Sequence, residues 1–326
     1  MLYKTVNRNS IVALVVMPLM LLGFWTNSLM ALQSPGFPFE LHAMPLWNFV
    51  ANILKGNQLI ATIISMFIAL LLMFGVNRIT NRYSLSTGQT SAPGFIYLLF
   101  ISGYLMVQKL HPVWFFAPLL LLAIERLFLA YGHRKPMAWC FEAMFWLSLG
   151  TLFYAKGIYL SILVWMTMFI LRLFTLRSFL ATLIGLVLPY LLAFGYYFWM
   201  DKHMWFLELI FENFASPVAF FSHTIFSQWY NGLIIALVFV AIMAVVRIMP
   251  MVKIISRKHY RIFIWLIVLC VVASLTPYFS LEIIPILALG SAIISNRFIS
   301  AIRRTIIQEI LFALLIILTI SAQFLI

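Results

Sequence analysis

The sequence predicts an all-α, polytopic integral membrane protein with about eleven transmembrane helices and two interfacial helices on its outer face. Its 326 residues are 65% hydrophobic and only 9% charged, whereas an ordinary soluble chain carries about 25% charged residues. The mean hydropathy is +1.08. Apolar runs close to the ~20 residues that a helix needs to cross a bilayer recur along the whole length. They leave no room for a soluble domain, so residues 1–326 are predicted to form a single transmembrane domain.

The apolar runs define the predicted spans. In chain order these lie near Ile11–Leu32, Gln58–Val76, Phe95–Gln108, Val113–Ala130, Ala138–Phe153, Ile158–Arg172, Phe179–Met200, Trp229–Arg247, Phe263–Phe279, Ile283–Ser295 and Ile306–Ile326. Met1–Ser10, with Lys4 and Arg8, resembles the start of a signal peptide. The run after it is too long for one and has no small-x-small cleavage site, so it is expected to remain as the first span.

The basic residues indicate the orientation of the chain. When the spans alternate through the bilayer, every arginine and every lysine except Lys55, Lys109, Lys156 and Lys202 falls on one side. The positive-inside rule makes that side cytoplasmic. We therefore predict a multi-pass protein of the bacterial inner membrane, with a cytoplasmic N-terminus and a periplasmic C-terminus. The net charge of +13 is explained by these short clusters, so nucleic acid is not expected as a partner.

Three acidic residues lie near the cytoplasmic ends of predicted spans. Glu125 adjoins Arg126, and Glu309 follows Arg303 and Arg304, spacings that favour local charge compensation. Glu142 has no obvious partner in the sequence. It is either a snorkelling side chain or a functional carboxylate within the membrane.

The two long outer loops carry the candidate site. Each contains a stretch that is apolar on most of its surface, around 46–55 and 201–212, which predicts a helix lying on the membrane or an aromatic anchor. Ahead of the first, two prolines and a glycine stiffen the segment that presents Glu40 and His42. A carboxylate or imidazole held there can act as a general base.

Further outer groups could complete such a site. Lys109, His111, Lys156 and Glu282 are the candidate substrate-binding residues, because a lysine beside apolar walls attracts a lipid phosphate more strongly than it would in bulk water. For each residue taken alone, a solvated position at the interface is the simpler interpretation. Cys140 and Cys270 lie in apolar runs without any metal or redox spacing, so no metal and no cofactor are expected.

Two resemblances accompany these patterns. At Val6-Asn7-Arg8-Asn9-Ser10, at Leu171–Arg177 and at Gly185…Pro189-Tyr190, the chain resembles a family of bacterial inner-membrane proteins without an established activity. More weakly, at Gly150–Tyr154, in the acidic first outer loop and at Tyr278…Ile284-Pro285, it is similar to the C-type membrane glycosyltransferases. The second resemblance implies a sugar donor carried on a polyprenyl phosphate, an outer-loop carboxylate as base, which here is Glu40, and cationic side chains that hold the phosphate.

Three functions are therefore open. The first is an envelope glycosyltransferase that acts on a lipid-linked substrate at the outer face, with membrane lipids or a polyprenyl-phosphate carrier as its partners. The second is a non-catalytic subunit or assembly factor, which suits an aromatic content of 17% and a need for membrane protein partners. The third is a transporter for a lipid carrier, for which repeats and broken helices are the usual signs. No convincing internal repeat is present in the sequence.

Overall fold

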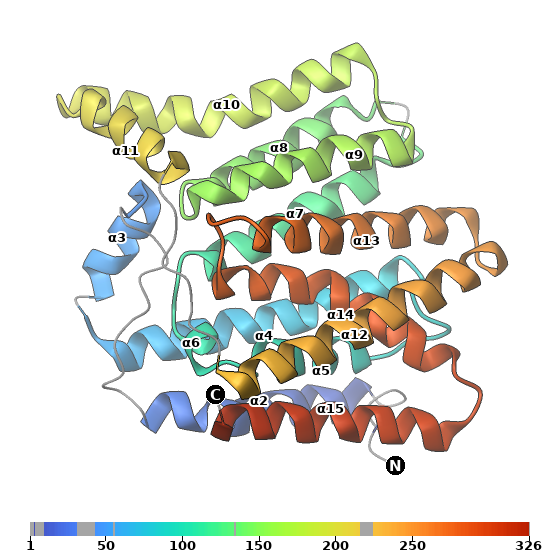
Figure 1. The fold of residues 1–326 in the computed structure, drawn as a ribbon. Coiled ribbons are helices and arrows are strands. Elements are labelled where there is room, and N and C mark those ends of the chain that lie inside the picture. Colours follow the sequence, from blue (N-terminus) through green and yellow to red (C-terminus); the bar gives the residue numbers. More distant parts are fainter. Residues whose placement is uncertain are drawn as a thin grey trace.

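The fold is all-helical in the computed structural model, which describes residues 3, 10–30, 43–54, 56–133, 135–215 and 224–325, without the side chains of 10–13 and 215. No strand occurs in these ranges. The long helices run roughly parallel or antiparallel to one another and form one bundle (Figure 1).

The helices follow one another with short connections. The first half contains α2 (Ser10–Met30), α3 (Pro45–Leu54), α4 (Gln58–Arg82), α5 (Ala92–Ile101), α6 (Leu105–Gln108), α7 (Val113–Ala130), α8 (Met137–Thr151), the 3-10 helix η1 (Ala155–Leu160) and α9 (Ser161–Leu171). The second half contains α10 (Leu176–Trp199), α11 (His203–Ala215), α12 (Ile225–Ile248), η2 (Met249–Met251), α13 (Ile254–Ser274), η3 (Leu281–Ile283), α14 (Ile284–Ala301) and α15 (Thr305–Leu325).

Six helical segments are long and apolar enough to cross a membrane. They are Gln58–Arg82, Val113–Ala130, Leu176–Trp199, Ile225–Met251, Leu281–Ala301 and Thr305–Leu325. Each predicted span overlaps a helix, but the predicted count of eleven crossings is not confirmed. Helix α5 has 10 residues and α9 has 11, which is well short of the ~20 residues of a full crossing.

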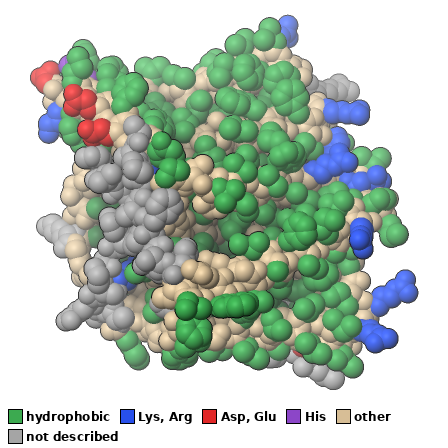
Figure 2. All heavy atoms as spheres, in the orientation of Figure 1, with side chains coloured by type: hydrophobic (Ala, Val, Ile, Leu, Met, Phe, Trp, Pro, Cys, Tyr) green, Lys and Arg blue, Asp and Glu red, His purple; other side chains and the backbone are tan. Residues whose placement is uncertain are grey.

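Charge is distributed unevenly between the two ends of the bundle. The helix ends that carry Arg82, Arg126 and Arg297 lie together, and we call this the basic end. The opposite end, with Asp201 and Glu208 around the turn from α10 to α11, is the acidic end. In Figure 2 lysines and arginines project mainly from one edge, while the acidic side chains gather at the opposite corner. Which end faces the cytoplasm stays a prediction from the positive-inside rule.

Both predicted surface segments contain helices, α3 and α11. Asp201, with φ 54°, makes the sharp turn that redirects the chain from α10 into α11. Helix α11 then packs against α10 and η1 at the acidic end. The position of these helices at a membrane surface remains a prediction.

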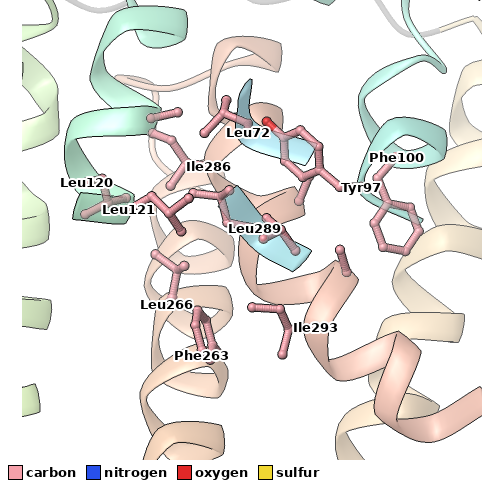
Figure 3. Packing of buried hydrophobic residues seen from close by; sticks show 14 of the residues in the cluster. Leu72, Tyr97, Phe100, Leu120, Leu121, Phe263, Leu266, Ile286, Leu289 and Ile293 are labelled. Carbon is pink, nitrogen blue, oxygen red and sulfur yellow. The ribbon is translucent and has the colours of Figure 1, made fainter. Parts of the chain in front are cut away.

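The core lies where α4, α5, α7, α13 and α14 meet. Every residue of α5 is buried, and α14 packs against α5, α12 and α13. Figure 3 shows Leu72, Tyr97, Leu121, Phe263 and Leu289 interlocking at this junction. Because α5 and α14 are covered by protein on all sides, their backbone polar groups are shielded from lipid.

Two glycines permit close contacts between helices. A Cβ atom on Gly290 of α14 would lie 2.9 Å from the Phe263 carbonyl oxygen of α13, and one on Gly185 of α10 would lie 2.6 Å from the Phe141 carbonyl oxygen of α8. Both helix pairs can therefore approach each other only through a residue without a side chain. Gly232, for which the sequence favoured a similar contact or a kink, has no atom within 4 Å of its Cβ position.

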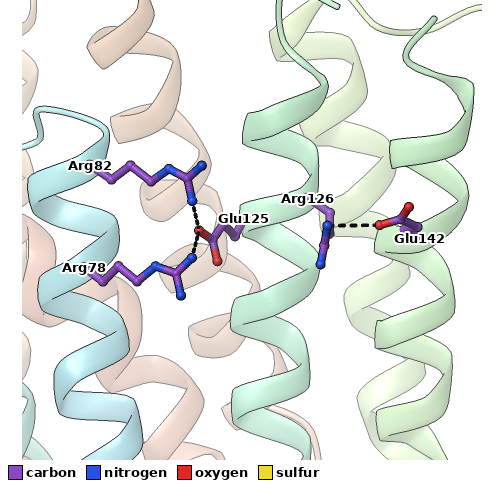
Figure 4. Close-up of polar contacts among 5 residues, drawn as sticks. All are labelled: Arg78, Arg82, Glu125, Arg126 and Glu142. Atoms are coloured by element: carbon purple, nitrogen blue, oxygen red, sulfur yellow. Dashed lines mark hydrogen bonds and ion pairs between the residues drawn. The ribbon is translucent and has the colours of Figure 1, made fainter.

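The ion pairs at the basic end differ from the sequence prediction. Glu125 does not pair with its neighbour Arg126. Its Oε1 accepts hydrogen bonds from Arg78 at 3.1 Å and from Arg82 at 2.7 Å, and Arg126 instead contacts Glu142 of α8 at 3.2 Å (Figure 4). Adjacent residues of a helix point in different directions, so Glu125 faces α4 and Arg126 faces α8. Glu142 thus has a partner, which lies on another helix.

Candidate functional site

Two charged side chains are buried together at the acidic end. Lys156 lies in η1, between α8 and α9, and is 6% exposed, while Glu282 lies in η3, between α13 and α14, and is 0% exposed. These connections meet because α9 packs on α13 and α13 packs on α14. The Lys156 ammonium interacts electrostatically with the Glu282 carboxylate. The bundle therefore brings together two of the residues that the sequence suggested for substrate binding.

Both oxygens of Glu282 are engaged within the protein. Oε1 accepts a hydrogen bond from the Tyr154 hydroxyl at 3.3 Å, and Oε2 accepts one from the backbone N–H of Ser280 at 3.0 Å. Tyr154 is itself fully buried and contacts the ring of Phe116 on α7. A buried carboxylate held by two donors and a nearby ammonium is stabilised in its charged form. It ties η1 to η3 and is poorly placed to act as a base.

Lys109 and His111 form a second group, in the connection from α6 to α7. The indole N–H of Trp114 donates to the carbonyl oxygens of Val107 and Lys109, each at 3.0 Å, which folds the connection back on itself. The His111 ring lies 5.8 Å from the Trp114 ring and is 2% exposed. Burial lowers the pKa of His111 to about 3, so it is neutral near pH 7. Burial also lowers the pKa of Lys109.

The two groups share one neighbour, the first turn of α7. Trp114 contacts His111, while the next two residues stack on the α8 end, Phe115 on Phe153 at 5.0 Å and Phe116 against Tyr154. Among the described residues, no contact joins Lys109 or His111 directly to Glu282. Glu40 and His42, the predicted catalytic residues, lie outside the described part of the chain. Their roles stay predictions.

A cavity of ≈ 260 Å³ opens beside this site, between α12, the end of α13, and α14. Its walls are mostly apolar, and they include the exposed Ile235 of α12 and Leu287 of α14. The inner wall is formed by residues of α5 and α14. The segment from Phe279 to Ile284 lines it on the side of η3, so the buried Glu282 stands directly behind the cavity wall.

Polar groups are concentrated at one part of the cavity. The Tyr104 hydroxyl lies 2.9 Å from the Ser227 Oγ and also interacts with Asn231. Tyr230 packs edge-on against Tyr104. On the opposite wall, the Ser291 hydroxyl is buried without a hydrogen-bond partner, which is uncommon for a buried polar atom. The cavity thus combines apolar walls with a few polar groups, as ligand sites commonly do.

The sequence did not single out Tyr104, Tyr230, Asn231 or Ser291. Each lies within or next to an apolar run, where a hydroxyl or an amide is ordinary. Only the packing of α12 against α14 brings them to one cavity. No three His, Cys, Asp or Glu side chains come together within the described ranges, and both cysteines are free and buried.

Comparison with known proteins gives no match to a protein-family model, a curated protein or a solved structure.

Proposed function

We propose that the chain is an integral membrane enzyme of the bacterial envelope that acts at its acidic end on a lipid-linked substrate, in the manner of the polyprenyl-phosphate-dependent glycosyltransferases. The observation that carries this proposal is the apolar cavity between α12, α13 and α14. Its rim is made of residues that a bilayer would bathe, and it adjoins the part of the molecule where the buried charged pair lies.

The cavity suits a hydrocarbon chain. Ile235 is 63% exposed and Leu287 is partly buried, so a lipid tail can reach the rim without crossing a polar layer. At ≈ 260 Å³ the cavity lies just below the ~300–1,000 Å³ of typical small-molecule sites. It is therefore sized for a segment of a chain, with the remainder of the lipid left in the bilayer.

The polar part of the reaction would take place above the cavity. Lys109 is the half-buried cation outside the Glu282 network, and a lysine near apolar walls favours a phosphate. Glu40 is the proposed base, with His42 beside it in the sequence. The Lys156–Glu282 pair would hold η1 and η3 in place while the substrate is bound.

A photoreactive polyprenyl-phosphate analogue in nanodiscs tests the binding step. We expect the analogue to label α12 and α14, and the substitution Ile235→Trp to reduce labelling because a larger ring would obstruct the rim. Ile184→Trp is the matched control, since Ile184 is 61% exposed on α10 and does not line the cavity. Labelling that ignores Ile235→Trp would exclude the cavity as the chain site.

A second variant tests the chemistry separately. Glu40→Gln should abolish sugar transfer and leave lipid labelling and expression unchanged, because it removes a base without changing the size of the side chain. Undiminished transfer in Glu40→Gln would rule out the proposed role.

A non-catalytic subunit is the second candidate, and the surface of α10 and α11 favours it. Trp199 is 89% exposed and Phe211 is 71% exposed, and both helices lie at one edge of the bundle (Figure 1). Aromatic side chains are enriched where proteins bind each other. Purification in mild detergent should then recover a stoichiometric partner that Trp199→Ser releases, whereas a functional monomer would count against a subunit role.

A further inference from the structure

A polar pocket of ≈ 490 Å³ lies at the basic end of the bundle, far from the proposed lipid cavity. It is formed by the connection from α4 to α5, the turn from α12 to α13, and the last turns of α14. Helices α4, α12 and α14 all end on this side, as Figure 1 shows. Polar residues line about as much of it as apolar ones do, which contrasts with the apolar cavity at the other end.

Arg297 is the central feature of this pocket. It is only 8% exposed, and its Nε is buried without a hydrogen-bond partner. No acidic side chain of the described residues pairs with it, because Glu125 and Glu142 are engaged by other arginines. A buried guanidinium without a countercharge is costly. The cost is removed when an anion occupies the pocket.

The surrounding groups would complement an anion. Lys253 adds a second positive charge at the mouth, where it is exposed, and the segment from Ser86 to Gln89 supplies hydroxyl and amide groups. No aspartate or glutamate of the described chain lines the pocket. The local field therefore favours negative charge.

The wall of the pocket is held in place by hydrogen bonds. The Tyr260 hydroxyl donates to the Leu85 carbonyl oxygen at 2.6 Å, and the Ser256 hydroxyl donates to the Ser84 carbonyl oxygen at 3.3 Å. Asn81 and Thr90 close the connection with two bonds of 2.9 Å. The binding groups are thus positioned before a ligand arrives, which lowers the entropic cost of binding.

We propose that this pocket binds a phosphate group, with the guanidinium of Arg297 as its principal ligand and Lys253 as a second cation. A planar guanidinium presents paired N–H donors that match two phosphate oxygens, and hydrogen bonds between charged groups are about twice as strong as neutral ones. A soluble phosphate compound and a phospholipid headgroup offer the same chemistry. The site is independent of the enzyme proposed for the acidic end.

Two binding measurements on the purified full chain separate these sources. Inorganic phosphate is titrated calorimetrically into protein in neutral detergent at constant ionic strength. In parallel, retention of phosphatidic acid is compared with retention of phosphatidylcholine by native mass spectrometry. Binding of phosphate itself assigns the pocket to soluble ligands. Selective retention of phosphatidic acid alone assigns it to a headgroup.

Charge-neutralising variants decide whether the pocket is responsible. Arg297→Gln should weaken binding at least about tenfold, equivalent to about 1.4 kcal/mol. Arg303→Gln is the matched control, because Arg303 is exposed at the same end and does not line the pocket, and it should change affinity less than about twofold. Equal losses in both variants, or no binding of either probe by the native chain, would overturn the proposal.

Lys253→Gln keeps the test decisive if Arg297→Gln does not fold. Lys253 is exposed, so its replacement leaves packing unchanged, and we expect a loss of about threefold. A Lys253→Gln protein that binds as tightly as Arg303→Gln would contradict the assigned site.

Discussion

Replacing Gly290 by alanine should destabilise the bundle, whereas the same change at Gly232 should stabilise it slightly. The added Cβ atom at 290 would lie 2.9 Å from the Phe263 carbonyl oxygen and 3.0 Å from the Ile267 Cγ1. The first neighbour is backbone, which cannot turn aside, so α13 and α14 must move apart. Overpacking of this kind costs about 1–3 kcal/mol.

The control at Gly232 isolates that cost. Alanine is favoured over glycine within a helix by about 0.8–1 kcal/mol, and this gain applies equally to both positions. Because nothing lies within 4 Å of the Cβ position at 232, Gly232→Ala should show the gain alone. The difference in unfolding free energy between the two variants is then the overpacking cost itself, about 1–3 kcal/mol.

Thermal unfolding in detergent, followed by tryptophan fluorescence, measures this difference. For a chain of this size, about 2 °C or slightly less per kcal/mol is expected. Gly185→Ala should be still more damaging, since its Cβ atom would lie 2.6 Å from the Phe141 carbonyl oxygen. If Gly290→Ala melts at or above Gly232→Ala, the close approach of α14 to α13 is not what stabilises the bundle.

Three further predictions concern titration and polar contacts. Because the pKa of His111 falls to about 3 in the fold from about 6.5 when unfolded, the neutral form favours folding above pH 6.5, and this contribution is lost as the pH falls towards 3. It should amount to about 2 kcal/mol at pH 5, so a stability–pH curve should flatten over this range in His111→Gln; an unchanged slope would refute the assignment. Glu125→Gln should cost about 1–2 kcal/mol, because the Glu125 side chain is 10% exposed and serves two arginines, while Glu142→Gln, at 41%, should cost less than about 1 kcal/mol; equal melting temperatures would contradict this ranking. Tyr154→Phe removes a hydrogen bond to the buried Glu282 carboxylate and should cost about 1.5–3 kcal/mol in the native chain but much less in a Glu282→Leu background, a coupling that a double-mutant cycle measures.

Much of the helical architecture could be predicted from hydropathy, and the pairing of helices could not. Long apolar runs such as Gln58–Val76 identify their helices because a backbone in lipid must satisfy its own hydrogen bonds. The contact of Glu125 with Arg78 and Arg82 depends on how α7 packs on α4, which the local sequence does not encode. Adjacency to Arg126 therefore gave the wrong partner.

The candidate sites show the same division. Lys156 and Glu282 could be identified as unusual charges in outer turns, but their burial and their connection through Tyr154 follow from the meeting of two distant turns. The sequence directed attention to the acidic end alone. Arg297 was counted there as one of many topological arginines, because nothing in the chain near residue 297 indicates that its guanidinium is buried without an acidic partner.

The enclosure of α5 has a consequence for how the protein is made. This helix of 10 residues is buried along its entire length and is too short to span a bilayer by itself. When it leaves the ribosome its neighbours α14 and α15 have not been synthesised, so the surface that finally covers it does not yet exist. We expect α5 to wait in a provisional position, shielded by α4 and by the insertion machinery, and to settle only when the C-terminal helices arrive. Truncation before α14 should therefore expose this segment to quality-control proteases, although most of the apolar sequence would already be in the membrane.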